Sequence, residues 1–458
     1  MSSGARSVFF YWDRMFTSIH SIRLKLAATS AAVMLAACGG GGSSAPPPTG
    51  GLTLDPGDGQ VTVRWAATSG VDYWLGWLAA ATVSLDIGSP HTWVINVSSP
   101  FVLPGLANGT TYAFSVDGRI GGGPGGTATP SMATVPRPGG ATWNAGTPPA
   151  LGATDMHSIA YGTASDTTVD YVAVGNTSAV YKGTDGINWT QVTTTGLPSS
   201  GFDFHAATYA FSNFIAGGSG GQIYYSSDMA TWTAANASSV SSQPINAMAS
   251  NGTIVVAVGN GGTILYSGNA TTWAAAATVP SGTGNLNGVT YAATGIWLAV
   301  GDNGKLLTST DGSNWTAQTN IAPALTSSIN LKSVSVLYTA STGVYTYVAV
   351  GTGGTVLTST NATTGTAATW ASATVGGGAY DLNAVVVPST NTQLLTVGTG
   401  GAVYTSPNGM TWTDPRVAAT TVGTCNANTS DWLGMISAAA PIVQYVAVGN
   451  GGVSCNSH

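Results

Sequence analysis

Glutamate is absent from this sequence, and all 17 acidic residues of the 458-residue chain are aspartates. Charged residues make up only 6% of the chain, far below the roughly 25% that is usual in globular proteins. Such a chain cannot stabilise helices through rows of i,i+4 charge pairs. The formal net charge of -6 argues against a nucleic-acid partner, since binding to phosphates requires a basic surface.

Glycine is abundant instead, with 63 residues, and alanine, serine, threonine and valine fill much of the remaining sequence. This composition favours many short strands joined by glycine-rich turns. The sequence therefore predicts an all-β protein.

The N-terminus has the features of a secretory signal. Arg23 and Lys25 precede a short apolar run, 26–37, which is too short to span a membrane as a helix. The run ends in Leu-Ala-Ala-Cys, which resembles the bacterial lipobox. The resemblance implies that 1–37 is a lipoprotein signal peptide and that Cys38 is lipidated. The alternative is an ordinary signal peptide with an incidental cysteine.

Two further details bear on the start of the chain and on its localisation. Either Met1 or Met15 can be the true first residue. Gly39 follows the lipobox cysteine, and by the same resemblance this implies sorting to an outer membrane. We expect a lipid-anchored protein of the cell envelope, or an extracellular one.

Cysteine is scarce, with three residues in all. Apart from Cys38, the pair Cys425 and Cys455 predicts a disulfide in an oxidising compartment. Its closed loop of about 30 residues would contribute about 3 kcal/mol. A structural zinc site is disfavoured, because it requires four ligands.

After a flexible linker, 38–50, the first folded unit spans 51–136. Alternating patterns predict strands at 60–65, 73–77, 101–106 and 111–116. Trp65, the run from Leu106 to Val116 and a late glycine-rich hairpin resemble a fibronectin type III domain. The resemblance implies a β-sandwich in which the Tyr112 hydroxyl bonds back to the preceding corner. No catalytic constellation is visible in this unit.

A repeat occupies 141–458, and its clearest copy is 298–316. An apolar strand runs into a glycine-rich turn, a second strand follows, and a Ser-Thr-Asp-Gly turn leads to a tryptophan. The turn glycines recur every 42 to 51 residues, at Gly175, Gly217, Gly259, Gly301, Gly351, Gly398 and Gly449. With one more strand upstream, each unit has four strands, which predicts a seven-bladed β-propeller. The last unit lacks its tryptophan strand, and 141–144, with Trp143, is predicted to complete it.

The Asp-Gly-x-x-Trp turns resemble the Asp-box (BNR) repeat of sialidases, sortilin-type receptors, some xyloglucanases and photosystem assembly factors of the Ycf48 type. The residues that carry the resemblance are Asp185, Asp228 and Asp311 with Trp189, Trp232 and Trp315. Asn269, Asn361 and Asn408 replace the aspartate in other copies. The predicted role is structural, because Asp and Asn cap such turns and tryptophan packs between sheets.

The activities of these relatives do not transfer to this chain. Only Arg416 is present from 141 onward, so the arginine cluster that grips a sialidase substrate cannot form. Glutamate-dependent glycosidases are excluded, whereas a two-aspartate inverting mechanism stays open. Too few cations are available for the basic patch of the Ycf48 type.

One set of polar residues lies at equivalent places on the innermost strands. Asp155 with His157, and Asp203 with His205, occupy the first two units. The residues equivalent to these histidines elsewhere are Asn246, Asn287, Lys332, Asn383 and Leu433. This hub ring predicts either a divalent-metal or small-ligand site, or a belt of polar groups bonded to one another.

The sequence as a whole favours a non-enzymatic binding or scaffold protein for a protein or glycan partner. No cofactor is expected. The best contact surface is the propeller face that carries the glycine-rich turns. The sequence leaves enzymatic activity open, and the alternative is a carbohydrate-active hydrolase that uses Asp residues on the propeller face.

Overall fold

The computed structural model describes residues 45, 48–86, 88–121, 125–137, 139–146, 153–165, 169–198, 201–318, 329–362, 368–388, 393–416, 425, 428–438 and 444–457. The predicted signal peptide, Cys38 and most of the linker lie outside these residues. The chain forms two compact units, one of 1–55 with 61–136 and one of 56–60 with 137–458. No helix in the described ranges is long and apolar enough to cross a membrane.

The first unit contains seven strands in two antiparallel sheets. One sheet has the order β1-β2-β5, and the other has the order β4-β3-β6-β7. The strands are β1 (Thr49–Gly57), β2 (Gln60–Ala66), β3 (Asp72–Leu78), β4 (Thr92–Val97), β5 (Phe101–Pro104), β6 (Tyr112–Arg119) and β7 (Met132–Thr134). All four strands predicted from the sequence in this unit are present.

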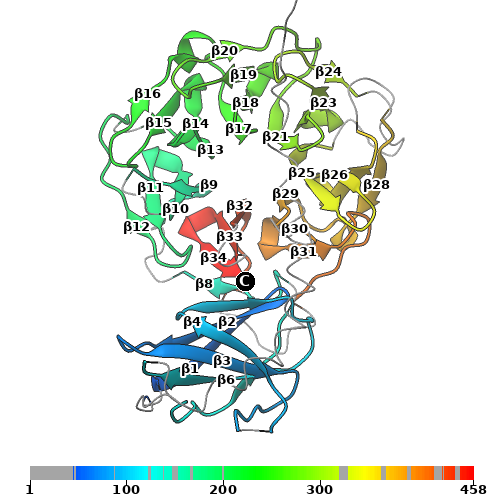
Figure 1. Ribbon diagram of the computed structural model, residues 1–458. Coiled ribbons are helices and arrows are strands. Elements are labelled where there is room, and N and C mark those ends of the chain that lie inside the picture. Colours follow the sequence, from blue (N-terminus) through cyan, green and yellow to red (C-terminus); the bar gives the residue numbers. More distant parts are fainter. Residues whose placement is uncertain are drawn as a thin grey trace, which may run out of the picture. The chain divides into compact units, whose positions relative to one another are not determined.

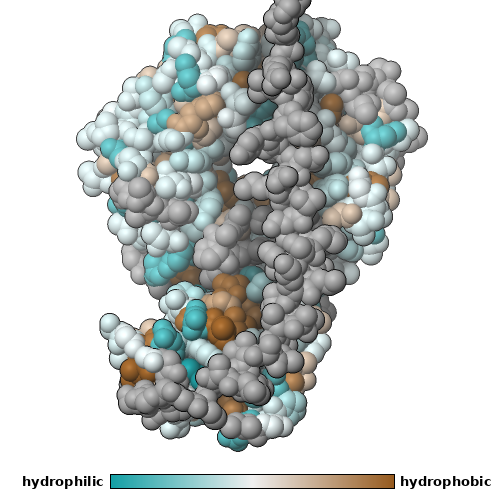
Figure 2. All heavy atoms as spheres, viewed as in Figure 1, coloured by the Kyte–Doolittle hydropathy of each residue, from teal (hydrophilic) through white to brown (hydrophobic). Residues whose placement is uncertain are grey.

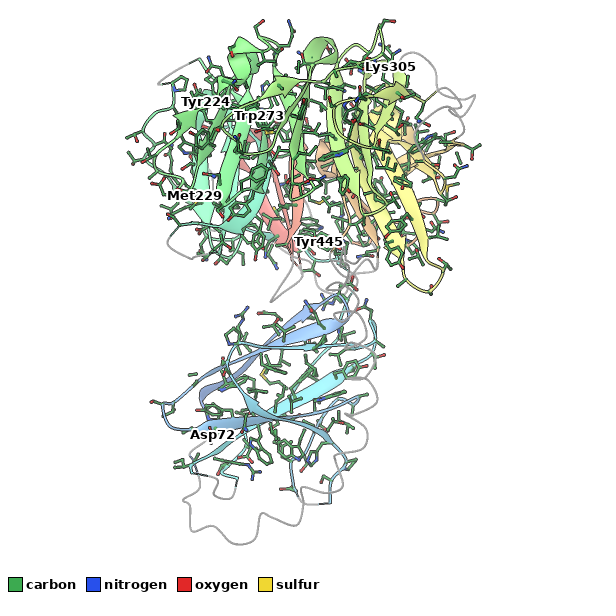
Figure 3. The ribbon with its side chains drawn as sticks, turned by 45° about the horizontal axis from the view of Figure 1, so that its top comes forward. Asp72, Tyr224, Met229, Trp273, Lys305 and Tyr445 are labelled. Carbon is green, nitrogen blue, oxygen red and sulfur yellow. A yellow bond between two sulfur atoms is a disulfide. The ribbon has the colours of Figure 1, made fainter. Side chains whose placement is uncertain are left out.

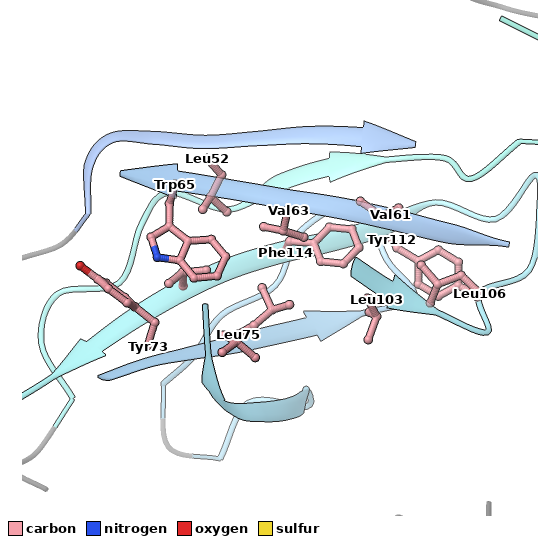
Figure 4. Close-up of a cluster of buried hydrophobic side chains, with 12 residues drawn as sticks. Leu52, Val61, Val63, Trp65, Tyr73, Leu75, Leu103, Leu106, Tyr112 and Phe114 are labelled. Atoms are coloured by element: carbon pink, nitrogen blue, oxygen red, sulfur yellow. The ribbon is translucent and has the colours of Figure 1, made fainter. Parts of the chain in front are cut away.

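One apolar core contains side chains from both of these sheets (Figure 4). Val61 and Val63 of β2 are fully buried, as are Leu75 of β3 and Phe114 of β6. This alternation follows from the period of two along a strand, which directs every second side chain to the same face. The backbone N–H of Ala107 donates to the hydroxyl of Tyr112 over 3.1 Å, the contact predicted for Tyr112.

The second unit is a ring of radially arranged antiparallel sheets (Figure 1). The innermost strands are β9 (Met156–Thr163), β13 (Phe204–Ala210), β17 (Ile245–Ser250), β21 (Leu286–Ala292), β25 (Leu331–Thr339), β29 (Leu382–Val386) and β32 (Trp432–Ala438). The second strands are β10 (Val169–Gly175), β14 (Asn213–Gly218), β18 (Val255–Gly259), β22 (Ile296–Gly301), β26 (Val344–Gly351), β30 (Leu394–Gly398) and β33 (Gln444–Gly449).

The outer half of each sheet is shorter. The third strands are β11 (Val180–Gly183), β15 (Ile223–Ser226), β19 (Ile264–Ser267), β23 (Leu306–Ser309), β27 (Thr355–Ser359), β31 (Val403–Ser406) and β34 (Ser454–Ser457). The outermost strands are β12 (Thr190–Gln191), β16 (Thr233–Ala234), β20 (Ala274–Ala275), β24 (Thr316–Ala317), β28 (Ala371–Thr374) and β8 (Asn144–Ala145). Each sheet is named below by its innermost strand.

Two details differ from the sequence prediction. The innermost strands start one residue later than their predicted first residues, which are Asp155, Asp203, Pro244, Asn285, Asn330, Asp381 and Asp431. In the second repeat the glycine at the end of the second strand is Gly218 rather than Gly217, since the turn that follows begins at Ser219.

The core of the ring lies between neighbouring sheets. One cluster combines Val172 and Val174 of the β9 sheet with Phe214 and Trp232 of the β13 sheet. Another cluster joins Leu298 of the β21 sheet to residues of the β25 sheet, among them Trp370. Each sheet therefore buries both of its faces against its neighbours, which explains its near-continuous apolar second strand.

The first and last segments of this unit meet in one sheet. β8 pairs with β34, in the register Ala145 to Cys455. Trp143, which precedes β8, is 1% exposed and stacks on Trp432. Cys425 and Cys455 form a disulfide with a Cα–Cα distance of 6.3 Å. The Cys425 N–H also donates to the Trp143 carbonyl over 2.9 Å, so the bridge ties together the segments on both sides of the seam.

The β29 sheet has three strands where four were predicted. Its expected outermost strand is reduced to a single bridge between Thr405 and Thr413. In the β9 sheet, the outermost strand is extended by Val192, whose N–H donates to the Val180 carbonyl. The residue equivalent to Val192 is Pro415, which has no N–H to donate, so the strand ends early.

We predict that Cys455→Ser destabilises the second unit by about 3 kcal/mol, because the bridge closes a loop of about 30 residues across the seam. Thermal or urea unfolding followed by tryptophan fluorescence measures this loss. Cys425→Ser and the double variant should match the single variant, and the wild-type protein in reductant should match all three. Equal stability of the oxidised wild type and the variants would refute the prediction.

Candidate functional site

The two sides of the ring carry different turns. The short 3-10 turns between second and third strands lie on one side, called here the turn face. The Ser-x-Asx turns between third and outermost strands, in the first of which Gly183 takes the place of Ser, lie on the other side, called here the box face. Figure 3 shows Lys305, which follows one of the 3-10 turns, and Met229, within one of the Ser-x-Asx turns, on opposite sides of the ring.

On the turn face, an Asp or Asn before six of the seven innermost strands reaches across to the preceding sheet. Its side-chain oxygen accepts a hydrogen bond from the backbone N–H of a turn residue with positive φ. Six such bonds are present: Asp155 to Gly451 (2.7 Å), Asp203 to Thr177 (2.9 Å), Asn285 to Gly261 (3.1 Å), Asn330 to Asn303 (3.1 Å), Asp381 to Gly353 (2.9 Å) and Asp431 to Gly400 (2.8 Å). We call them the inter-sheet Asx bonds.

The junction between the β13 and β17 sheets lacks this bond. Pro244 takes the place of the Asp or Asn, and the turn residue that faces it is the exposed Gly220, with φ of 62°. The sequence contains the signal for the whole set, namely an Asx residue before the innermost strand in six of seven repeats. The sequence prediction used those residues only to mark where strands begin.

The residue two places further along forms the predicted hub ring. Asn246 donates from Nδ2 to Asn260 Oδ1 (2.8 Å) and to the Leu286 carbonyl (2.9 Å). Asn287 repeats this arrangement with Asp302 and the Leu331 carbonyl. Asn383 donates to the Trp432 carbonyl over 2.6 Å. These side chains connect neighbouring sheets, as the polar-belt interpretation requires.

Lys332 is the cation of this ring. Its ammonium donates to Asp381 Oδ2 (3.0 Å) and to Asn383 Oδ1 (2.8 Å). Partial burial alone would raise the pKa of Asp381, but the bonds from Gly353 and Lys332 lower it below its usual value. Asp381 is therefore a charged carboxylate that accepts one hydrogen bond from the Gly353 N–H and one from the Lys332 ammonium.

His157 and His205 are brought together, with their ring centroids 5.5 Å apart and their planes at 80°. His157 Nε2 lies 2.7 Å from Asn176 Oδ1. Burial lowers the pKa of His205 and the neighbouring His157 lowers it further, while Asp203 and a bond to the Ile245 carbonyl oppose this. His205 is consequently a neutral imidazole at pH 7.

The two aspartates of the predicted site are engaged elsewhere, since one oxygen of Asp155 and one of Asp203 make inter-sheet Asx bonds. The described residues contain no group of three or more His, Cys, Asp or Glu side chains that would hold a metal ion. Of the four predicted metal ligands, only His157 and His205 therefore lie together without being engaged in inter-sheet Asx bonds.

On the box face, five of the six Asp or Asn residues of the Ser-x-Asx turns accept from backbone N–H groups two and three residues on, and Asn361 accepts from the N–H of Thr369. Asp185 accepts from Ile187 (2.9 Å) and Asn188 (2.7 Å), and Asp228 from Ala230 (2.9 Å) and Thr231 (2.7 Å). Asn269 and Asn408 do the same. The predicted structural role of these turns matches this geometry.

The tryptophans that follow these turns are anchored as well as buried. Trp232 and Trp315 donate from Nε1 to the carbonyl three residues earlier, at 2.7 and 2.9 Å. Trp189 instead donates to Ser454 Oγ in the β32 sheet over 2.8 Å. All three are at most 9% exposed, so they pack between sheets and do not present a ligand surface.

Asp311 has the most strongly shifted titration of the turn aspartates. Partial burial would raise its pKa, but hydrogen bonds from Asn314, Ser313 and Ser309 lower the pKa to about 2. A carboxylate held charged in this way is a good turn acceptor and a poor general acid.

Comparison with known proteins yields structural neighbours only. No protein-family description and no curated protein matches the sequence. A structure of Ycf48 bound to a D1 peptide is 14% identical, with a TM-score of 0.52 over 69% of this chain and 94% of that chain. Ycf48 from Cyanidioschyzon merolae is 17% identical, with a TM-score of 0.51 over 69% and 99%. The WD40 β-propeller domain of Doa1 is 8% identical, with a TM-score of 0.49 over 67% and 93%.

At these identities the likeness concerns the fold alone. Together with the ring of radial antiparallel sheets, it defines the second unit as a β-propeller. The propeller and the all-β class predicted from the sequence are thus confirmed.

We predict that Asp311→Ala lowers the free energy of unfolding by about 1 kcal/mol, as the loss of a capping side chain does elsewhere. Asp311→Asn should cost less, because Asn fills the equivalent place in three other repeats. The lowered pKa of Asp311 stabilises the fold above pH 4, and this contribution is lost as the pH falls towards 2. Urea unfolding at pH 7 and pH 3 should show a smaller pH effect in Asp311→Asn than in the wild type, and an unchanged pH effect contradicts the assignment.

We predict that Asp203→Ala destabilises the propeller by about 1–2 kcal/mol, because it removes an acceptor from the Thr177 N–H. Asp203→Asn should restore most of the loss, since Asn makes the same bond at two other junctions. Differential scanning calorimetry measures both variants. If both lose stability equally, the charge of Asp203 and not its hydrogen bond is responsible.

Proposed function

We propose that this chain is a non-enzymatic binding or scaffold protein of the cell envelope. In this proposal the propeller has seven blades with Asp-box-like turns, a fibronectin type III-like sandwich precedes it, and a lipid on Cys38 anchors the chain. The seven sheets among the described residues of the second unit, and the two sheets that share one core in the first, support this architecture.

The use of the aspartates is the observation that carries the proposal. On the turn face Asp155, Asp203, Asp381 and Asp431 accept backbone N–H groups, and on the box face Asp185, Asp228 and Asp311 do so. A glycosidase instead needs a pair of carboxylates facing a cleft, one of them with a raised pKa. Aspartates that each cap a turn favour a binding protein over the alternative hydrolase.

The turn face is the proposed contact surface. Its turns are fixed by the inter-sheet Asx bonds, so a partner would meet a preorganised surface and lose little conformational entropy on binding. Tyr380 is 39% exposed on this face, beside the Lys332–Asp381 pair. A Cβ on Gly400 would lie 2.9 Å from the Tyr380 ring, so this ring rests against the turn and is held in place.

A protein or peptide segment is the first candidate partner, and a glycan is the second. One of the structural neighbours contains a bound peptide, which supports the first candidate. Tyrosine is also enriched among the residues that dominate protein interfaces. On the face drawn in Figure 2, the described part of the ring is mostly in pale tones of near-neutral hydropathy and carries no broad apolar patch.

The lipid anchor has its own support in the Leu-Ala-Ala-Cys sequence that ends the apolar run. Cys38→Ser should abolish incorporation of a radiolabelled fatty acid and release the chain into the soluble fraction. Labelling that persists in Cys38→Ser would remove the anchor from the proposal and leave the propeller's binding role intact.

The binding role is tested with the Cys38→Ser chain on peptide and glycan arrays, followed by biolayer interferometry with the strongest hits. Tyr380→Ala should weaken binding about 30-fold, the effect of losing an interface hot spot of about 2 kcal/mol. Met410→Ala is the matched control, because Met410 is 46% exposed within a Ser-x-Asx turn of the same β29 sheet. Binding that is lost in Met410→Ala and kept in Tyr380→Ala would contradict the assignment to the turn face.

A further inference from the structure

His157 and His205 of the hub ring each make fewer hydrogen bonds than Asn246 at the equivalent place of another sheet. Asn246 uses both N–H bonds of its amide, one towards the turn of its own sheet and one towards the next sheet. A neutral imidazole has a single N–H. His157 makes only the first of these contacts, to Asn176, and His205 makes only the second, to the Ile245 carbonyl.

These contacts determine the tautomer of each ring. Asn176 Oδ1 and the Ile245 carbonyl oxygen can only accept, so the imidazole nitrogen that faces each of them carries the proton. The other nitrogen of each ring is the one available to bind a metal ion. In the described part of the chain, no residue donates a hydrogen bond to either of these second nitrogens. Two imidazole rings therefore lie close together, each with one nitrogen that has no hydrogen-bond partner among the described residues.

The spacing of the rings fits a shared metal ion. With a metal–nitrogen bond of about 2.0–2.1 Å, the centroid of a bound imidazole lies about 3.2 Å from the ion. Two such rings whose centroids are 5.5 Å apart then subtend an angle of about 120° at the ion. This value lies near the tetrahedral angle, and the interplanar angle of 80° is compatible with it, because rotation about a metal–nitrogen bond is free.

We propose that His157 and His205 form a two-imidazole site for a late first-row divalent cation, with Zn²⁺ favoured by the near-tetrahedral angle and Cu²⁺ as the more tightly bound probe. Imidazole is a preferred ligand of both ions, and Cu²⁺ binds more tightly to a given set of nitrogen ligands. Two protein ligands leave coordination positions for water or for an oxygen or nitrogen atom of a bound partner. The site lies among the hub residues on the turn face, and it stands independently of the proposed binding role.

Asn176 and the Ile245 carbonyl would be the positioning groups of this site. A metal-bound histidine almost always donates its other N–H to such an acceptor, which orients the ring and makes the bound nitrogen more basic. Asp155 and Asp203 would remain in their inter-sheet bonds, so they are not required as ligands. Asn246, Asn287, Lys332 and Asn383 of the hub ring retain their belt of hydrogen bonds.

The test is titration of the Cys38→Ser chain with Cu²⁺ and separately with Zn²⁺ by isothermal calorimetry, together with electron paramagnetic resonance of the Cu²⁺ form. The informative variants are His157→Asn and His205→Asn, because Asn is the residue that other sheets use at this place and should preserve the fold. We expect one equivalent of Cu²⁺ with two coupled imidazole nitrogens in the wild type, and at least tenfold weaker binding in either variant. Asn176→Ala should weaken binding 10–100-fold, as loss of an orienting partner does.

His91→Ala and His458→Ala are the matched controls, since they remove a histidine of the first unit and one at the C-terminus. Neither should change the affinity. The proposal is overturned if the His157→Asn/His205→Asn double variant, folded by circular dichroism, keeps the wild-type affinity. It is also overturned if the resonance spectrum shows a single nitrogen ligand, because the pair then makes only an edge-to-face ring contact.

Discussion

The ring depends on the hydrogen bond between an Asp or Asn side chain of one sheet and a left-handed turn of the sheet before it. Backbone N–H groups at such turns point away from their own strand, so a partner has to come from outside the sheet. The neighbouring sheet supplies that partner in six of seven junctions. Each bond fixes the distance between sheets at the turn face and leaves the apolar second strands in contact beneath it.

The need of these turns for a hydrogen-bond acceptor explains the role of the aspartates in a chain with so few charged residues. Seven aspartates of the second unit are hydrogen-bond acceptors for turns, four between sheets and three within the Ser-x-Asx turns. Asparagine replaces aspartate at other repeats, because the geometry needs an oxygen acceptor more than it needs a charge. The turn sequences resemble a repeat found in some hydrolases, but carboxylates committed to turns are not available as acid and base.

Local features of the sequence were predicted well because their partners lie within a few residues. The Asp311 turn, the Tyr112 contact and the repeat of apolar second strands all follow from short-range patterns. The disulfide was predicted from the even pair of cysteines left after Cys38, and the pairing of the Trp143 segment with the last strand from the missing tryptophan strand of the last unit. The missing fourth strand of the β29 sheet was not foreseen, although Pro415 was visible, because the pairing partner of that position becomes defined only when the register of the sheet is known.

The sequence by itself determined the fold class, the repeat and the residues that cap turns, because strand alternation and turn chemistry act over short distances along the chain. Only the tertiary structure decided what the residues before and within the innermost strands do. The sequence placed Asp155, His157, Asp203 and His205 in one candidate site. The closing of the ring brings neighbouring sheets together, so that the two aspartates bond to turns of adjoining sheets and the two imidazoles lie edge to face, 5.5 Å apart. These contacts join residues between 26 and 296 positions apart in the chain, so they depend on how sheets are stacked, and that geometry is not encoded in any one repeat.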